Sequence, residues 1–295
     1  MADSKESRKY LFQFIIAMVT FGTIGIFRRF IPLDSGILAM LRGLVGGIVI
    51  IIYLTATKQT FFGADFHGKT LLVVLIGAIM GFNWVTLFES YNYTSVSTAT
   101  LCYYMEPVFL ILLTPILFKE KLTWKKIACV IVAFIGMIFV SGILTEKISD
   151  NDLKGILLGL LSAVLYAIVV CGARLITDID SYKKTALQLL SAGLVMIPYL
   201  IIKGTFDEPL PAELFQLKTI ILLAIVCIFH TGIVYLWYFQ SINHLKMSQV
   251  AVLSYIDPVV AIILSQVILH ENMGWQGAVG TVLILGSAFV SEKVK

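Results

Sequence analysis

The sequence predicts an all-α integral membrane protein with ten transmembrane helices, arranged as two inverted five-helix repeats. Three observations predict this fold. Apolar residues make up 59% of the 295 residues and charged residues only 14%, whereas soluble domains average roughly 45–50% and about 25%. Uncharged stretches of the length of a membrane span recur along the whole chain. Finally, the two halves of the chain match each other at a nearly constant offset.

Ten stretches are long and apolar enough to cross the hydrocarbon core of a bilayer, which takes about 20 residues in a helix. Seven of them carry no Lys, Arg, Asp or Glu: 11–27, 70–88, 127–145, 155–173, 185–202, 219–243 and 272–291. Three carry one such residue each: 35–57 with Arg42, 97–118 with Glu106, and 248–269 with Asp257. The strands of a membrane barrel are only about 9–11 residues long, so these lengths predict helices.

The orientation of the spans is predicted from the lysines and arginines between them, which favour the cytoplasmic side. With the N-terminus inside, the cytoplasmic segments contain Lys5, Arg8, Lys9, Lys58, Lys69, Lys119, Lys121, Lys125, Lys126, Arg174, Lys183, Lys184, Lys246, Lys293 and Lys295, and the outer segments contain Arg28, Arg29, Lys147, Lys154, Lys203 and Lys218. The pair Arg28–Arg29 runs against this bias. We expect a multi-pass protein of the cytoplasmic (inner) membrane with both termini in the cytoplasm.

Several function classes are disfavoured by the composition. The net charge of +4 is small and spread over short loops, which does not suggest nucleic-acid binding. The cysteines lie inside apolar stretches without metal or redox spacing, at Cys102, Cys129, Cys171 and Cys227. The dipeptide His270-Glu271 lacks the second histidine of a zinc protease, and no P-loop or G-x-S-x-G motif is present. We therefore predict no enzyme, no metal and no cofactor.

The internal repeat is the most informative pattern in the sequence. At an offset of 151 residues the matching pairs are Gly81 and Gly232, Phe88 and Phe239, Ser97 and Ser248, Tyr104 and Tyr255, Pro107 and Pro258, Glu120 and Glu271, and Trp124 and Trp275. Nearer the start of each half an offset of 146 places Arg42 over Gln188 and Gly47 over Gly193. The predicted units are 1–148 and 149–295. Because five spans is an odd number, the second unit enters the membrane from the opposite side.

Inverted repeats are typical of secondary transporters. Two similar halves in opposite orientation can pack in two nearly equivalent ways, one open to each side of the membrane. This favours alternating access, with the substrate site near the midplane between the repeats. A duplication that merely produced a stable bundle is the structural alternative, and a channel is a further one, although no repeated pore filter is visible in the sequence.

Several runs resemble one known family: 83–97, 104–107, 118–123 and 253–261, with His270-Glu271 after the last. In these runs the sequence is similar to EamA-type transporters of the drug/metabolite transporter superfamily. The resemblance implies ten spans as two five-helix repeats, and export rather than uptake. It implies a substrate among amino acids, choline, sugars, nucleobases, vitamins and other metabolites. In this family the residue before the fourth-span proline is usually uncharged, whereas this sequence has Glu106 there.

Two acidic residues lie about ten residues into their spans and each directly precedes a proline, as Glu106-Pro107 and Asp257-Pro258. A charged carboxylate at that depth costs at least about 2.5 kcal/mol, so it needs a partner, water or a function. Each proline removes a helix hydrogen bond and bends or breaks the helix. Interrupted backbone at membrane depth is tolerated where it lines a cavity. The two pairs therefore predict helix kinks beside a polar site.

Helical spacing places Tyr103 on the same stripe as Glu106, and Ser254 on the same stripe as Asp257. The inverted symmetry predicts that the two stripes face each other across a central cavity. One interpretation is that the carboxylates bind a cationic group of the substrate or a coupling proton. The alternative is that they bond to neighbouring hydroxyls and hold the bundle together.

Two further polar residues lie inside predicted spans. Arg42 is about seven residues into the second span, where it pairs with a protein carboxylate, meets a substrate carboxylate, or extends toward the surface. His230 lies well inside the eighth span, and a proton relay and a hydrogen-bonded structural role are both open for it.

Mid-span aromatic residues are candidates to hold a ring or a quaternary ammonium group through cation–π contacts. The candidates are Phe21, Trp84, Tyr103, Tyr166 and Tyr255. The structural alternative is that these aromatics pack between helices or face lipid.

Together these observations predict a secondary transporter for a small polar or amphipathic metabolite, with an amino acid or related amine as the expected substrate. We expect export, with protons as possible partners beside the substrate and the lipid bilayer, and a monomer or weak homodimer. The alternatives are a facilitative or uptake carrier for choline-like amines, nucleobases or vitamins, and more remotely a channel or an intramembrane enzyme.

Overall fold

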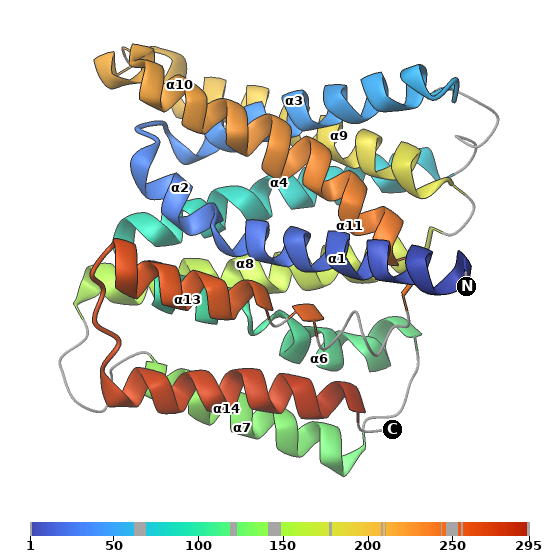
Figure 1. Cartoon of the computed structure of the whole chain (residues 1–295). Coiled ribbons are helices and arrows are strands. Elements are labelled where there is room, and N and C mark those ends of the chain that lie inside the picture. The colour runs from blue at the N-terminus through green and yellow to red at the C-terminus, as the bar shows by residue number, and fades with distance from the viewer. Residues whose placement is uncertain are drawn as a thin grey trace.

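The computed structural model describes residues 2–61, 69–118, 123–140, 149–176, 179–207, 209, 211–242, 244–245, 253–254 and 256–293. All regular secondary structure within these ranges is helical (Figure 1). The α-helices are α1 (Ala2–Gly22), α2 (Ile24–Phe30), α3 (Ser35–Ala56), α4 (Thr70–Tyr93), α5 (Val96–Tyr103), α6 (Glu106–Phe118), α7 (Trp124–Val140), α8 (Asp150–Arg174), α9 (Ser181–Lys203), α10 (Leu217–Ala224), α11 (Val234–Ile242), α13 (Ile256–Ile268) and α14 (Gly274–Lys293). Two short 3₁₀ segments, η1 (Thr205–Asp207) and η2 (Ala212–Phe215), precede α10, and the π-helix η3 (Ile225–Ile233) joins α10 to α11.

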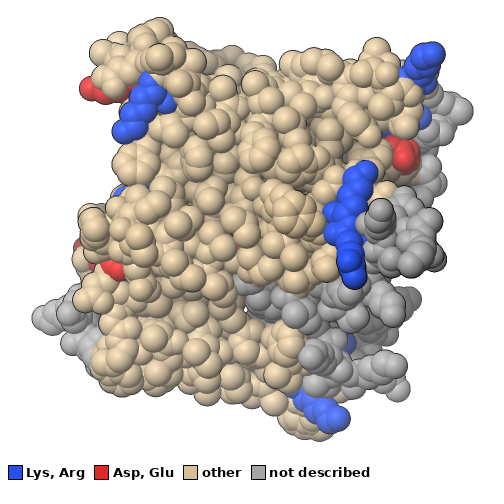
Figure 2. All heavy atoms as spheres, in the orientation of Figure 1, with Lys and Arg blue, Asp and Glu red and all other residues tan. Residues whose placement is uncertain are grey.

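Six helical stretches in the described part of the chain are long and apolar enough to cross a membrane. They are Arg8–Phe30, Ser35–Ala56, Thr70–Tyr93, Asp150–Ala173, Ser181–Lys203 and Leu217–Tyr238, and Ile256–Ile268 is a shorter apolar helix. These stretches coincide with the predicted spans one, two, three, six, seven, eight and, for the shorter helix, nine. The prediction of an all-helical fold is confirmed. Figure 2 shows a broad uncharged face, with the charged residues gathered toward the two ends of the helices.

Two of the predicted spans are interrupted, and a third changes its helical form. The first breaks at Thr23, between α1 and α2, where the Thr23 hydroxyl donates to the Thr20 carbonyl at 2.7 Å. The fourth breaks after Tyr103, and α6 begins at Glu106, one residue before Pro107. Because proline has no N–H to donate, a helix passing through this position would lose a backbone hydrogen bond. The eighth widens into η3. Apolar periodicity does not reveal such local changes.

Helix starts follow from side chains that bind the free backbone N–H groups of the first turn. Asp34 accepts from Gly36 N and Ile37 N at the start of α3, and Asp180 does the same for α9. Ser95 caps α5 and Ser149 caps α8. These caps set where the helices leave the loops, and therefore how deep each side chain lies along its helix.

The bundle is held together by pairs of helices from the two halves of the chain. α3 packs on α9, α4 on α8, and α7 on α14, which lie side by side at one edge of the bundle (Figure 1). α3 and α9 run antiparallel and almost touch, since a methyl group added at Gly43 would lie 2.5 Å from the Gly193 nitrogen. A methyl group at Gly47 would meet the Leu190 side chain at 2.8 Å. Only glycine at these positions permits this approach.

The pair Arg28–Arg29, which runs against the charge bias of the loops, is bound within the protein. Arg28 is 7% exposed and donates to the Ile31 carbonyl at 3.1 Å and to the Ser35 hydroxyl at 3.0 Å. Arg29 donates to the Thr94 carbonyl at 2.8 Å. These arginines hold the corner between α2, α3 and α4. They therefore carry little information about which side of the membrane the corner faces.

Candidate functional site

The two predicted carboxylates lie at the N-terminal ends of α6 and α13, with side chains that are half-buried. Glu106 is the first residue of α6 and Asp257 the second residue of α13. The Tyr104 hydroxyl, in the gap between α5 and α6, interacts electrostatically with the Asp257 carboxylate. A side chain of the first half of the chain is thus coupled to the acid of the second half.

Tyrosines surround both acids. Tyr103, Tyr166 and Tyr238 each interact electrostatically with both Glu106 and Asp257. The rings of Tyr103 and Tyr166 are 5.5 Å apart between centroids. These tyrosines come from α5, α8 and α11, so residues of three helices interact electrostatically with the same two carboxylates. Each of the three side chains keeps part of its surface exposed.

Phe21 of α1 packs against two tyrosines of α11, Tyr235 and Tyr238. Its ring lies 5.3 Å from that of Tyr235 and 5.9 Å from that of Tyr238, both in edge-on geometry. Gly22 follows directly, and a methyl group there would lie 2.5 Å from the Asp257 backbone oxygen. The break between α1 and α2 is therefore beside Asp257. Edge-on pairs are a favoured geometry of aromatic rings and contribute about 0.5–1.5 kcal/mol beyond the area they bury.

Arg42 of α3 lies on a second side of the tyrosines and is 5% exposed. Its Nε donates to the Thr231 hydroxyl at 3.0 Å. Its Cζ atom is 4.3 Å from the centroid of the Trp84 ring and 5.2 Å from that of Phe88. Tyr103 and Tyr235 interact electrostatically with both Arg42 and Asp257. The arginine and the acid therefore share neighbours.

The π-helix η3 supplies the partner of Arg42. The Thr231 hydroxyl donates to the Val226 carbonyl at 2.9 Å, five residues back, as the wide turn of a π-helix allows. The neighbouring His230 is buried, and its Nε2 atom forms a 2.7 Å hydrogen bond with the Thr23 hydroxyl at the break between α1 and α2. His230 also packs edge-on against Phe27, at 4.8 Å between ring centroids. These contacts describe a hydrogen-bonded histidine that holds the break in place.

The remaining sequence-predicted residues are placed as follows. Trp84 packs against Arg42 rather than in the tyrosine group. Ser254 is described and half-buried, and Pro258 is buried in α13. Pro107 lies in the first turn of α6. Tyr255 lies outside the described residues, so its predicted role stays a prediction.

Four residues of the site were not singled out from the sequence: Tyr104, Tyr235, Tyr238 and Thr231. Tyr235 and Tyr238 are three residues apart, which places them on one face of a helix. That spacing is the signal that could have found them. No sequence pattern identifies Tyr104 or Thr231, because their partners, Asp257 and Arg42, are more than 150 residues away along the chain.

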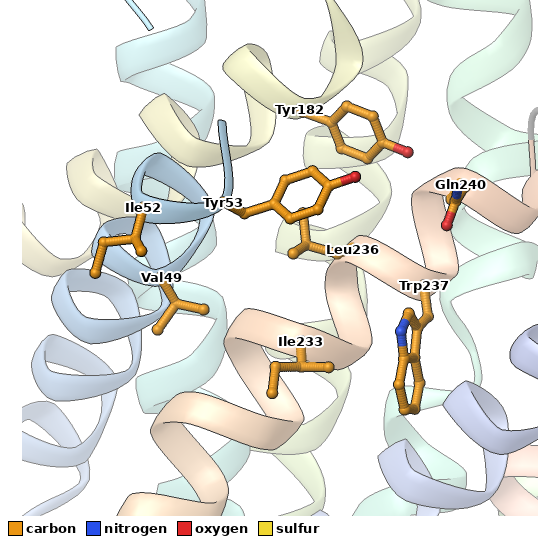
Figure 3. A pocket seen from close by; sticks show the side chains of 8 residues that line it. All are labelled: Val49, Ile52, Tyr53, Tyr182, Ile233, Leu236, Trp237 and Gln240. Atoms are coloured by element: carbon orange, nitrogen blue, oxygen red, sulfur yellow. The ribbon is translucent and has the colours of Figure 1, made fainter. Parts of the chain in front are cut away.

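Figure 3 shows a separate cavity of about 310 Å³ between α3, α9, η3 and α11. Its lining residues are Val49, Ile52, Tyr53, Tyr182, Ile233, Leu236, Trp237 and Gln240. The lining is mostly apolar, and it contains none of the residues predicted from the sequence. Among the described residues no group of three or more His, Cys, Asp or Glu side chains is placed to hold a metal ion.

Comparison with known proteins identifies the family. The sequence profile of the EamA-like transporter family matches residues 8–142 and 153–292. An uncharacterized transporter of Bacillus subtilis (strain 168), YxxF, is 30% identical over 283 residues, covering 96% of this chain and 89% of that protein. The biotin transporter of Escherichia coli (strain K12) is 23% identical over 228 residues, covering 75% and 74% of the two chains.

A solved crystal structure has the same fold, with a TM-score of 0.65, 19% identity, and coverage of 97% of this chain and 96% of that one. The apolar helices and the matched profile together indicate a multi-pass membrane protein, whose relatives are named as transporters and not as enzymes. This chain belongs to the EamA-like transporter family.

Proposed function

We propose that the protein is a secondary transporter that exports a small polar or amphipathic metabolite, an amino acid or related amine, by alternating access. One observation carries the proposal. Glu106, at the start of α6 after the gap that follows α5, and Asp257, in the first turn of α13, interact electrostatically with the same three tyrosines, Tyr103, Tyr166 and Tyr238. Interrupted helices that bring polar groups together inside a bundle are the usual construction of a transporter site.

The packing supports two inverted repeats, 1–148 and 149–295, with ten spans in all. Under this arrangement α3 corresponds to α9 and α7 to α14, and each of these pairs is in contact. α4, α5 and α6 of the first unit pack on α8, while α11 and α13 of the second unit pack on α1. A two-fold symmetry axis in the membrane plane would produce this exchange of partners between the two units. It would also produce the antiparallel contact between α3 and α9, in which Gly43 meets Gly193 and Gly47 meets Leu190.

The chemistry of the site suits a cationic group. A carboxylate away from bulk water is unfavourable as an isolated charge and is neutralised by a cation or a proton. Tyrosine faces attract ammonium groups through their quadrupoles. A carboxylate that carries either a proton or the substrate ammonium, but not both, exchanges one for the other, so that an inward proton gradient drives export across the cytoplasmic membrane.

The test is transport by purified protein in proteoliposomes, with wild type, Asp257→Asn, Glu106→Gln and the double variant. Amino acids, choline, nucleobases and biotin are offered, and counterflow is measured with and without a proton gradient. We expect Asp257→Asn to lower initial rates at least about tenfold. The matched control Glu213→Gln, at an exposed residue, leaves the rate unchanged. Wild-type turnover in both Asp257→Asn and Glu106→Gln would refute the proposed site.

A second candidate is uptake of a vitamin, which the likeness to a biotin transporter favours. The two candidates differ in direction and in substrate. Biotin counterflow without stimulation by an opposed proton gradient would select uptake over export. Saturable and stereoselective counterflow would select a carrier, whereas currents far above carrier rates would select a channel.

A further inference from the structure

We propose that Arg42 binds a carboxylate of the transported molecule, so that the substrate is an acid or a zwitterion rather than a simple amine. This inference rests on the proposed function, since it takes the surroundings of Arg42, Tyr103 and Tyr235 as part of the path of the substrate. It adds to that proposal the charge of the substrate and the identity of the substrate group that Arg42 binds.

The guanidinium of Arg42 uses only a small part of its binding capacity within the protein. Arginine has five N–H donors. In Arg42 the Nε donor binds Thr231, while the two terminal nitrogens donate to no partner among the described residues. The Trp84 ring, 4.3 Å from Cζ, contacts the guanidinium through its π-face. Stacking occupies the face of the group and leaves the in-plane N–H donors free for a planar anion.

Within the ranges that the structure describes, Arg42 also forms no ion pair with a carboxylate. The groups that interact with it electrostatically are the phenols of Tyr235, Tyr103 and Tyr91 and the thiol of Cys227, and no carboxylate is among them in the described part of the chain. A buried charge without a counter-charge is costly. A carboxylate supplied by the substrate removes that cost and forms two parallel charge-assisted hydrogen bonds.

Arg28 provides an internal comparison, because it is buried to nearly the same degree. Its Nη1 donates to the Ile31 carbonyl, and its Nη2 donates to the Ser35 hydroxyl at 3.0 Å and to the Asn92 side-chain oxygen at 3.3 Å. The terminal nitrogens of Arg28 are thus used to hold a corner of the fold. Those of Arg42 are not used in this way among the described residues, although the phenol groups of Tyr91, Tyr103 and Tyr235 interact with it electrostatically.

The site is asymmetric, which gives the substrate an orientation. The residue equivalent to Arg42 in the second half is Gln188, which is buried and neutral. Tyr235 and Tyr103 each interact electrostatically with both Arg42 and Asp257, so the cation and the acid share these neighbours. A zwitterion such as an amino acid matches this pattern, with its carboxylate on Arg42 and its ammonium toward Asp257.

The experiment measures binding alone, with pairs of probes that differ only in the carboxylate. The probes are phenylalanine, leucine, serine and lysine, each against its amide. The proteins, in lipid nanodiscs, are wild type, Arg42→Gln, Arg42→Lys and the control Arg8→Gln, whose residue is exposed. Tryptophan fluorescence reports binding, because Trp84 contacts Arg42.

We expect wild type and Arg8→Gln to bind at least one acid about tenfold to a hundredfold more tightly than its amide. Arg42→Gln should reduce that ratio to about one, and Arg42→Lys should restore part of it, since lysine keeps the charge but not the paired donors. An unchanged ratio in Arg42→Gln overturns the inference, as does wild type that binds no acid or prefers every amide. A folded Arg42→Lys variant keeps the comparison valid if Arg42→Gln does not fold.

This readout separates the inference from the proposed transport. If the preference for carboxylates depends on Arg42 but the protein moves none of the probes across a liposome membrane, the carboxylate site is supported and the transporter proposal is refuted. Transport of an acid and its amide at equal rates, unaffected at Arg42, keeps the transporter and removes the carboxylate site.

Discussion

The carboxylate of Glu271 caps the N-terminus of α5, which begins at Val96. The Val96 N–H donates to Oε1 at 2.9 Å, and the Ser97 N–H donates to Oε2 at 3.2 Å. The Arg29 guanidinium lies 3.5 Å from the same Oε1 atom and also donates to the Thr94 carbonyl. Because Glu271 lies between α13 and α14, its side chain joins the second half of the chain to the ends of α5 and α2, and through Arg29 to the end of α4.

Loss of this carboxylate should loosen the connection. Glu271→Ala leaves two N–H groups of α5 without an acceptor and Arg29 without its ion pair, so we expect a loss of stability of about 1–2 kcal/mol. Glu271→Gln should retain part of the stability, because an amide oxygen still accepts one N–H. Thermal unfolding in detergent measures both. Glu213→Gln is the control at an exposed glutamate, and an unfolding temperature for Glu271→Ala equal to that of the control would contradict the structure.

The glycine contact between α3 and α9 predicts a sharp difference between two glycine-to-alanine substitutions. At Gly43 a new methyl group would lie 2.5 Å from the Gly193 nitrogen and 2.6 Å from the Leu189 oxygen, so the helices must move apart. We expect Gly43→Ala to cost about 1–3 kcal/mol, as overpacking typically does. Gly286→Ala is the matched control, because nothing lies within 4 Å of the methyl group it adds. Folded yield and unfolding temperature report the difference, and equal values would refute the close contact.

The electrostatic interaction of Tyr104 with Asp257 predicts coupling between these two residues. Tyr104→Phe should lower transport or binding of an amine-bearing substrate severalfold, because it removes the hydroxyl that interacts with the carboxylate. In the Asp257→Asn background the same substitution should have little further effect. A double-mutant cycle on rates or affinities measures the coupling. Additive effects of the two substitutions would show that Tyr104 acts elsewhere.

The proposed topology predicts different labelling of two cysteine substitutions. Lys218 and Lys125 are exposed and are placed on the outer and the cytoplasmic side, respectively. In intact cells a membrane-impermeant maleimide should label Lys218→Cys, and it should label Lys125→Cys only after permeabilisation. The four native cysteines are buried and give a low background. The reverse pattern would place both termini outside.

The sequence was sufficient for the helices and for the choice of the two acids as candidates, because both depend on local properties. Apolar runs determine which segments become helices, and a carboxylate before a proline is visible wherever it occurs. The partners of these residues depend on packing between distant segments. Tyr104 reaches Asp257 only because α5 stops short of Pro107, and Thr231 reaches Arg42 through a π-turn that apolar periodicity cannot reveal.

Arg28 also shows that an inference from sequence can depend on packing that the sequence does not reveal. As a sequence position it counts as an outer-loop charge, which weakens the predicted orientation of the first hairpin. In the structure it is nearly fully buried and bound to Ile31, Ser35 and Asn92. Rules based on loop charge apply to residues that remain in contact with water and lipid headgroups, and only the fold shows which residues those are.

Where α3 crosses α9, backbone meets backbone at Gly43 and Gly193. The Leu44 side chain packs on Gly193, and the Leu190 side chain packs on Gly47, beside this backbone contact. The crossing therefore fixes the separation of the two helices at one point of their length. Geometrically it is a fulcrum, because any change in the angle between the helices displaces their ends more than this point.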